Sequence, residues 1–286
     1  MGENPFFSII TITYNAEEKI RDTIKSVLLQ KYIDYEYIIV DGKSTDNTMA
    51  VIKNYERSFI EKGISYKYIS EKDNGIYDAM NKGVSIAKGR WVYFLNAGDY
   101  LYDCSVLGEV KEADIDNSIG IIYGDTIIYK KNGLVKYDKS REIERIVSEL
   151  PFCHQSSFTK RELLLMHPFD ISYRICADYE FFTWCYTNKC IFRYISIPVS
   201  RYEFGGFSMC EDFEIDLLRE RNISRKENHM ISIEEYNSEL ERIEKLKNKR
   251  SVVRNIKRFI PDSVLAKRIY IKNLKSGWMV EENNNE

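Results

Sequence analysis

The sequence predicts an α/β fold in which helices flank a mainly parallel central sheet, with a helical extension at the C-terminal end. Over the first hundred residues, short apolar runs typical of strands alternate with segments whose apolar residues recur at helical spacing. Strands that alternate with helices are joined by crossovers, which gives a parallel sheet covered by helices. Three of the predicted strands end in polar clusters, and ligands bind beyond the carboxyl ends of the strands in such sheets.

The predicted strands are rich in β-branched and aromatic residues. Residues 6–14, FFSIITITY, form the first strand, and residues 37–40 form the second, which ends at Asp41. The remaining predicted strands are residues 66–69, residues 91–95, residues 119–129 (a strand or a hairpin) and residues 191–199, the last of them.

Helices are predicted between the strands, where apolar residues fall on one helical face. Residues 44–48 carry the small polar side chains that favour a helix start, and a further helix is predicted around Asp178. The apolar faces of the first three helices consist of Ile20, Ile24, Val27 and Leu28, then Met49, Ile52, Phe59 and Ile60, then Ile76, Ala79, Met80, Gly83, Val84 and Ala87.

Composition and charge indicate a cytoplasmic protein with one core and an appendage. The 286 residues carry a formal net charge of -2, which argues against nucleic acid as a partner. The six cysteines form no C-x-x-C pair and only three histidines are present, which argues against a zinc site and favours reduced thiols. The N-terminus does not resemble a signal peptide, and no apolar run approaches the ~20 residues needed to span a bilayer. We therefore expect contact with a membrane surface at most.

Near residue 210 the alternating strand and helix patterns give way to charged helical segments. This change predicts a catalytic domain over residues 1–210 and a helical, basic extension over residues 211–286. Residues 281–286 read as a frayed tail. One helical face of the extension carries Val253, Ile256, Phe259 and Ile260, and Pro261 ends it. The basic residues between 242 and 275 are Arg242, Lys245, Lys247, Lys249, Arg250, Arg254, Lys257, Arg258, Lys267, Arg268, Lys272 and Lys275.

Asp99 is the candidate metal ligand. It follows the fourth predicted strand in the cluster Asn96-Ala97-Gly98-Asp99, at the sheet edge where ligands bind. A carboxylate there can hold a divalent cation against a diphosphate. The alternative is that Asp99 only caps a turn before Tyr100.

Asp178 is the candidate general base. It lies between Ala177 and the aromatic residues Tyr179, Phe181 and Phe182, and a carboxylate in a partly apolar setting can take a proton from an attacking hydroxyl. The alternative is an aspartate that caps the N-terminus of a helix.

Several other polar residues are candidates for ligand contact. Tyr14 at the end of the first strand could stack on a nucleobase, although a strand-end tyrosine more often packs in the protein. His154 and Gln155 could contact a phosphate or an acceptor, with a structural, hydrogen-bonded histidine as the alternative. The remaining candidates for contact with the ligand are Thr13, Asp41, Lys72, Asn81 and Asn96.

Taken together, these segments resemble family 2 glycosyltransferases, which have the GT-A fold. The resemblance extends over residues 6–208 and is carried by TITYN (11–15), IIVDGKSTDNT (38–48), NGIYDAMNKG (74–83) and GRWVYFLNAGD (89–99). Within the family the chain looks like the transferases of colanic acid biosynthesis, through EKDNGIYDAMNKG (71–83), FLNAGD (94–99), LPFCHQSSF (150–158), ADYEF (177–181) and GGFS (205–208).

The resemblance implies an inverting hexosyltransferase of bacterial surface polysaccharide assembly, with Asp178 at the base position and Asp99 at the metal position. It implies Mg²⁺ or Mn²⁺ as cofactor, and it places Tyr14 and Asp41 against the nucleoside of a UDP- or GDP-linked donor. The acceptor would be a glycan or a sugar on a polyprenyl diphosphate carrier. The basic extension would then lie on the anionic membrane surface, or else pack on protein.

Two positions depart from the family pattern. Gly42 stands where many members have a second aspartate, and residues 96–99 contain one carboxylate where the wider family has more. These departures keep open a non-catalytic nucleotide-sugar-binding protein. A sugar nucleotidyltransferase is the other alternative, but residues 13–22 lack its glycine-rich, basic signature.

Overall fold

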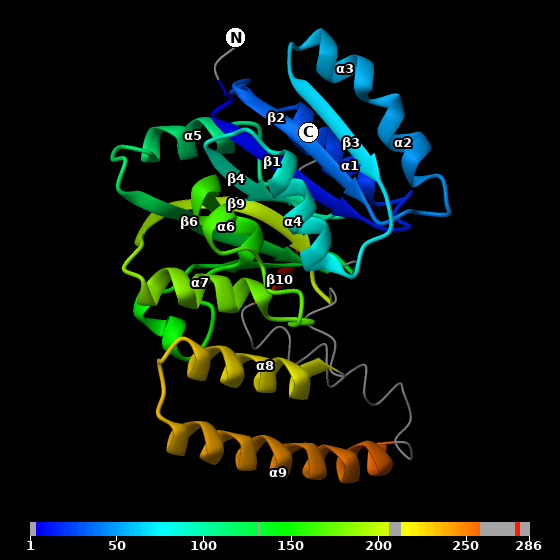
Figure 1. Cartoon of the computed structure of the whole chain (residues 1–286). Helices are drawn as coiled ribbons and strands as arrows, with labels where there is room; N and C mark the ends of the chain where they lie inside the picture. The colour runs from blue at the N-terminus through cyan, green and yellow to red at the C-terminus, as the bar shows by residue number, and fades with distance from the viewer. Residues whose placement is uncertain (1–3, 131, 206–212, 258–277, 281–286) are drawn as a thin grey trace.

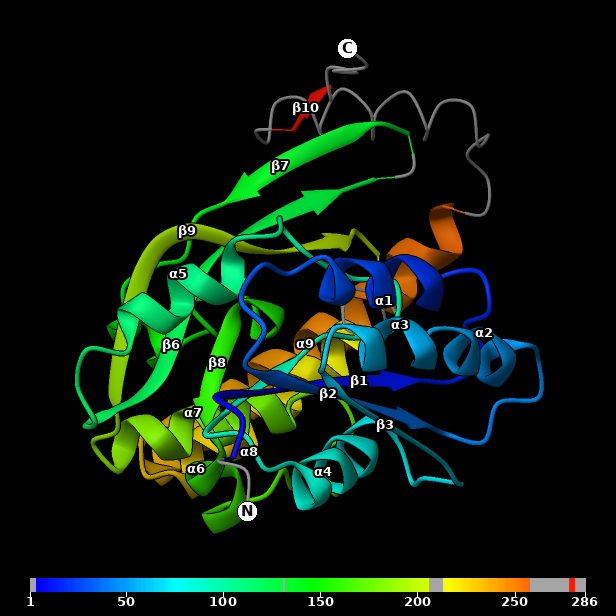
Figure 2. The ribbon, with the colours of Figure 1, turned by 90° about the horizontal axis from the view of Figure 1, so that it is seen from above.

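The computed structural model describes residues 4–130, 132–205, 213–257 and 278–280 (Figure 1). Within these residues, ten strands form one sheet, and helices cover both of its faces (Figures 1 and 2). This arrangement agrees with the α/β fold that the sequence predicts.

The first half of the sheet is parallel and places the candidate residues at one edge. Its strands, in the spatial order β4-β1-β2-β3, are β4 (Trp91–Phe94), β1 (Phe7–Thr13), β2 (Tyr35–Asp41) and β3 (Ser65–Ser70). The register pairs Thr13 with Asp41, and Asp41 with Ser70, so these strands end level with one another. The predicted gathering of strand-end polar residues at one edge is confirmed.

The second half of the sheet mixes parallel and antiparallel pairs. Its strands are β5 (Tyr100–Leu101), β6 (Ile119–Tyr129), β7 (Leu134–Asp138), β8 (Ser157–Lys160), β9 (Ile191–Glu203) and β10 (Met279–Val280). β8 lies antiparallel between β4 and β6, β7 forms a hairpin with β6, and β10 adds to β7. β9 pairs parallel with β6 and antiparallel with β5. The prediction of a mainly parallel sheet therefore holds for β1 to β4, and β9 is longer than predicted and is followed by β10.

The helices divide between the two faces of the sheet (Figure 2). Alternate residues of β1 supply both cores, since Ile9 packs on one side and Ile10 on the other, and both are fully buried. One face is covered by α1 (Ile20–Leu28), α2 (Thr48–Asn54), α3 (Glu56–Glu61) and α5 (Val106–Ala113). The other is covered by α4 (Ile76–Ile86), α6 (Arg161–Met166) and α7 (Ala177–Thr187).

The single apolar stripe predicted from Met49 to Ile60 is interrupted. α2 ends at Asn54 and α3 begins at Glu56, which breaks the helical repeat between them. Phe59 is fully buried as predicted, whereas Ile60 is 64% exposed, because the repeat restarts in a new phase. The prediction that Ile60 lies on the buried face is wrong.

A helical hairpin of α8 (Glu214–Glu227) and α9 (Ile233–Lys257) follows, with α8 against α7 (Figure 1). The predicted boundary at residue 210 lies outside the described residues, and the two-domain division stays a prediction. Val253 and Ile256 belong to α9, whereas Phe259, Ile260 and Pro261 lie outside the described residues, as do the basic residues beyond 257 and the tail 281–286. None of the described helices is long and apolar enough to cross a membrane.

Candidate active site

A cleft of 1180 Å³ opens beside the carboxyl ends of β1 and β4. Its walls come from the start of α4, the segment 150–155, the loop 171–176 before α7, and α8. The cleft brings together most of the residues predicted from the sequence, namely Thr13, Tyr14, Asn96, Asp99, His154, Gln155 and Asp178. Asp41, Lys72 and Asn81 do not line it.

At the sheet edge, two buried polar atoms are available to a bound molecule. Within the described residues, Thr13 Oγ1 and Asn96 Oδ1 have no hydrogen-bond partner. Buried polar atoms are nearly always hydrogen-bonded, so such atoms in a cleft are available to a bound molecule. Tyr14 beside them is 63% exposed, so its ring does not have the packing role that was the alternative for this residue.

The Asp99 carboxylate points across the cleft. Its turn is closed by the backbone, since Asp99 N donates to the carbonyl of Asn96 at 3.0 Å, and Asp99 Oδ2 accepts from Gln155 Nε2 at 3.1 Å. Burial raises the pKa of Asp99 to about 7, while the hydrogen bond from Gln155 and the charge of Lys19 lower it. The side chain is therefore not used to cap the turn before Tyr100.

Asp178 lies in the first turn of α7, where the N-cap is Cys176. The interpretation of Asp178 as the capping residue is therefore wrong by two positions. Its Oδ1 lies 2.9 Å from Tyr179 N and 3.2 Å from Tyr77 Oη, and its Oδ2 lies 3.6 Å from His154 Nδ1. The side chain is 22% exposed, so a substrate in the cleft can reach it.

His154 is held among aromatic rings next to Asp178. Its ring centroid lies 5.5 Å from that of Phe94, and Phe169 and Phe182 each lie 6.0 Å away. Burial lowers the pKa of His154, and the charge of Asp178 opposes that shift. His154 is therefore neutral at pH 7 and adds no positive charge beside Asp178.

The profile of glycosyl transferase family 2 matches residues 8–176, more than half of the chain. The chain belongs to this family. The PGL/p-HBAD biosynthesis glycosyltransferase of Mycobacterium bovis (strain BCG / Pasteur 1173P2) is 33% identical to this transferase over 208 residues, which cover 71% of this chain and 79% of that protein. The family predicted from the motifs is confirmed. The likeness to colanic acid transferases within it stays a prediction.

Solved structures support the fold of the transferase. The mannosyltransferase PcManGT from Pyrobaculum calidifontis, solved with GDP-Man and Mn²⁺, matches with a TM-score of 0.60 at 17% identity over 80% of this chain and 65% of that one. S. aureus TarS 1–349, solved with UDP, matches with a TM-score of 0.58 at 18% identity over 76% of this chain and 64% of that one. The transferase spans less than two thirds of either structure, and it has the predicted GT-A fold.

Three predicted donor-binding residues of the transferase do not line the cleft, and two of them, Asp41 and Asn81, hold its backbone. Asp41 is fully buried and accepts from Ser44 N at 3.0 Å and Ser70 Oγ at 2.6 Å, which shapes the loop after β2. Asn81 exchanges two hydrogen bonds with the backbone of Phe169, at 2.8 and 3.0 Å. Lys72 is exposed, next to the cleft residue Asp73. Donor contacts by these three residues stay predictions.

Asp73 is a cleft residue that the sequence reasoning missed. A β-carbon added to Gly42 would lie 2.6 Å from Asp73 Oδ2 and 3.5 Å from the ring of Tyr14. Asp73 therefore places a carboxylate beside Tyr14, in the space that a side chain at position 42 would occupy. The position of Asp73 just before the Asn74-Gly75 turn was the sequence signal that could have indicated it.

The helix α8 also lines the cleft of the transferase, through Leu217 and Arg221. Arg141 and Arg174 lie on the same walls, and Arg221 Nε has no hydrogen-bond partner among the described residues. Sequence reasoning missed these arginines because none stands in a recognisable motif. Tyr77 lies within the motif 74–83, but its contact with Asp178 spans 101 positions and only the fold reveals it.

Proposed function

We propose that the transferase moves one hexosyl residue, with inversion, from a UDP- or GDP-linked donor to a glycan or polyprenyl-diphosphate-linked acceptor during the assembly of a bacterial surface polysaccharide. The observation that carries the proposal is that Asp99 and Asp178 line the same cleft. Asp99 could hold a divalent cation against the donor phosphates, and Asp178 could take the proton of the acceptor hydroxyl.

The donor would occupy the end of the cleft formed by β1 and β4. PcManGT was solved with GDP-Man and TarS with UDP, which supports a nucleoside diphosphate in a fold of this kind. Tyr14 offers an exposed ring for the base, and Thr13 and Asn96 offer unpartnered polar atoms for hydroxyl groups. These groups do not discriminate between uracil and guanine, so either nucleotide fits the proposal.

The residues near Asp99 fit Mg²⁺ or Mn²⁺, which prefer oxygen ligands. The Asp99 carboxylate and the unpartnered Asn96 Oδ1 stand three positions apart on one turn. No cluster of three or more His, Cys, Asp or Glu side chains exists within the described residues, so the donor diphosphate and water would complete the coordination. A bound ion would offset the charge that develops on the diphosphate leaving group.

Asp178 would take the proton from the acceptor hydroxyl. The hydroxyl oxygen bonds to the anomeric carbon as the bond from that carbon to the diphosphate breaks, and the nucleoside diphosphate leaves with the electron pair. Attack from the face opposite the leaving group inverts the configuration at that carbon. Tyr77 and Tyr179 N fix the orientation of the Asp178 carboxylate, because both contact Oδ1 and leave Oδ2 toward the cleft and the neutral His154.

Positive charge favours an acceptor that carries phosphate. Arg174 and Arg221 line the cleft beside the start of α7, and Arg141, which pairs with Glu149, lines it as well. Guanidinium groups bind phosphate well. Arg242 and Lys245 on α9 are 72% and 80% exposed, which suits contact with an anionic bilayer at the cytoplasmic face.

The decisive experiment measures nucleoside diphosphate release from a panel of UDP- and GDP-linked sugars, with Mn²⁺ or Mg²⁺ and lipid-linked oligosaccharides as acceptors. Asp178→Asn should lower transfer about 10²- to 10⁴-fold, as expected for a lost general base. Asp22→Asn, which changes an exposed carboxylate on α1, should leave transfer unchanged. Nucleotide binding without turnover on any donor would favour the non-catalytic alternative.

Flotation with liposomes tests the membrane contact in the full chain. Replacing Arg242, Lys245 and Lys247 by glutamine should weaken association with vesicles that contain phosphatidylglycerol, and added salt should weaken it further. Equal flotation of both proteins would contradict the membrane contact and would leave the transfer reaction untouched.

A further inference from the structure

Glu220 on α8 binds the backbone immediately before the helix that carries Asp178. Its Oε1 accepts from Arg174 N, and its Oε2 accepts from Ile175 N and Cys176 N, each at 2.9 Å. Three consecutive backbone amides thus converge on a single carboxylate. Hydrogen bonds from amides to a carboxylate are charge-assisted and stronger than those between neutral groups.

The Glu220 carboxylate reaches the N-cap of α7. The side chain of the N-cap residue, Cys176, makes no capping hydrogen bond, and the amide of Cys176 donates to Glu220. Glu220 thus adds a negative charge at the positive end of the helix, beside Asp178 and Glu180 of the first turn. The conformation of residues 174–176, and with it the start of α7, therefore depends on α8.

The same segment is held from its other side by a residue that touches Asp178. Tyr77 Oη lies 2.5 Å from the carbonyl oxygen of Ile175 and 3.2 Å from Asp178 Oδ1. Residues 174–176 are thus bound between Glu220 and Tyr77. A shift in this segment would move Asp178, which follows it by two positions.

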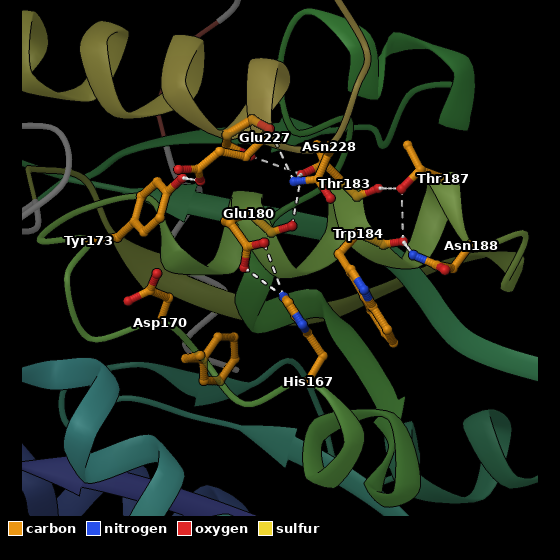
Figure 3. A network of polar contacts seen from close by, with 12 residues as sticks. His167, Asp170, Tyr173, Glu180, Thr183, Trp184, Thr187, Asn188, Glu227 and Asn228 are labelled. Carbon is orange, nitrogen blue, oxygen red and sulfur yellow. Dashed lines mark hydrogen bonds and ion pairs between the residues drawn. The ribbon is translucent and has the colours of Figure 1, made fainter.

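Further contacts fix α8 against α7 and against the loop before it. Thr183 Oγ1 and Ser224 Oγ lie 2.9 Å apart, and Asn228 Nδ2 lies 3.3 Å from Thr183 Oγ1. Tyr173 Oη donates to Glu227 at 2.6 Å. Figure 3 shows Asn228 and Glu227 reaching from the α8 side to Thr183 and Tyr173. These bonds hold α8, which carries Glu220, against α7 and the loop before it.

We propose that Glu220 is a positioning residue for Asp178, so that α8 is part of the catalytic site although it lies beyond residues 8–176, the region that matches the family profile. The inference rests on the proposed role of Asp178 as base. It assigns a mechanistic role to a helix that sequence reasoning placed in an appendage.

The test uses the full chain with Glu220→Gln, the conservative Glu220→Asp, and Asp216→Asn as a matched control, a carboxylate one turn earlier on α8 that pairs with Arg219. Glu220→Gln should lower kcat at least tenfold, while the Kd for UDP or GDP with Mn²⁺ stays within twofold, because α8 does not contribute to the β1 and β4 end of the cleft. Glu220→Asp should recover part of kcat. Hydrogen exchange of the amides of residues 174–176 should speed up at least tenfold in Glu220→Gln.

The outcomes separate this inference from the proposed function. Wild-type turnover with an unchanged kcat in Glu220→Gln overturns the positioning role alone. A parallel loss of nucleotide affinity and kcat also overturns it, because that result indicates general unfolding. Absence of turnover in the wild type, with every donor, overturns the proposed function, and the positioning role falls with it.

Discussion

Asp73 and Gly42 share one space at the edge of the cleft: a β-carbon on residue 42 would lie 2.6 Å from Asp73 Oδ2, closer than such atoms approach in proteins. The two residues belong to loops that follow β2 and β3, the neighbouring strands of the parallel half. The absence of a side chain at position 42 therefore leaves room for the carboxylate of Asp73 next to Tyr14.

Gly42→Ala should displace the Asp73 side chain and weaken nucleotide binding several-fold. The cost to the free energy of unfolding should stay below about 1 kcal/mol, because the displaced group is the end of a flexible side chain. Calorimetric titration with UDP and GDP measures the effect. Gly108→Ala is the matched control, since a β-carbon at Gly108 would contact nothing. Unchanged nucleotide affinity in Gly42→Ala would show that the position of Asp73 is irrelevant to the donor.

Tyr77→Phe should lower kcat about tenfold and leave nucleotide affinity unchanged. The variant removes the hydroxyl that lies between Ile175 O and Asp178 Oδ1, so the carboxylate loses part of its orientation. The lost hydrogen bond should cost about 1 kcal/mol of stability. Tyr35→Phe loses a comparable buried bond, to Val27 O at 2.8 Å and far from the cleft. If both variants lose the same activity, the effect of Tyr77 is one of stability and not of orientation.

His154→Gln should reduce the loss of stability in mild acid. Because burial lowers the pKa of His154, the unfolded chain binds its proton first as the pH falls. The stability due to neutral His154 is complete above about pH 6.5, the ordinary value, and is lost as the pH falls from there toward the lower folded-state pKa. Between pH 8 and pH 5, the melting temperature should therefore fall more steeply for the wild type than for His154→Gln. The exposed His229→Asn is the control, and identical slopes for all three proteins would refute the expectation.

Chelation should weaken nucleotide binding. Addition of EDTA should raise the Kd for UDP or GDP about tenfold or more, and Mn²⁺ should restore it, because Asp99 would hold the ion that offsets the charge of the diphosphate. Asp99→Asn should bind the nucleotide weakly whether or not metal is present. Equal wild-type affinity with and without metal would contradict a role for Asp99 as a metal ligand.

The parallel half of the fold was predictable because its signals are local. Each of β1 to β4 is a short apolar run, and Asp41 marks the end of one of them. The antiparallel half was less predictable, because pairing between distant segments leaves no local pattern. Strand β8 pairs with β4 across 65 to 69 positions and with β6 across 34 to 38 positions. The phase break at Tyr55, which exposes Ile60, also has no marker such as proline or glycine.

Within the cleft, local motifs located residues whose type suits one chemical task, and the roles of these residues stay predictions. Asp99, Asp178 and His154 stand in motifs with few alternatives, and all three line the cleft. Prediction did not reach Asp73, Tyr77 or Glu220, because their roles depend on neighbours far away in sequence. Asp41 shows the converse, since a strand-end carboxylate that looked available to a ligand is fully buried in hydrogen bonds to Ser44 and Ser70.

The pairing of β10 with β7 has a consequence for self-association. Trp278 covers Ile128 and Leu134, and Met279 and Val280 occupy the outer side of β7. Without them, β7 would present a row of unpaired backbone amides and carbonyls beside an uncovered apolar patch, which is the geometry that recruits a strand from another molecule. Trp278, Met279 and Val280 therefore shield one end of the outer edge of β7, and the apolar patch beside it, from the strand of a second copy.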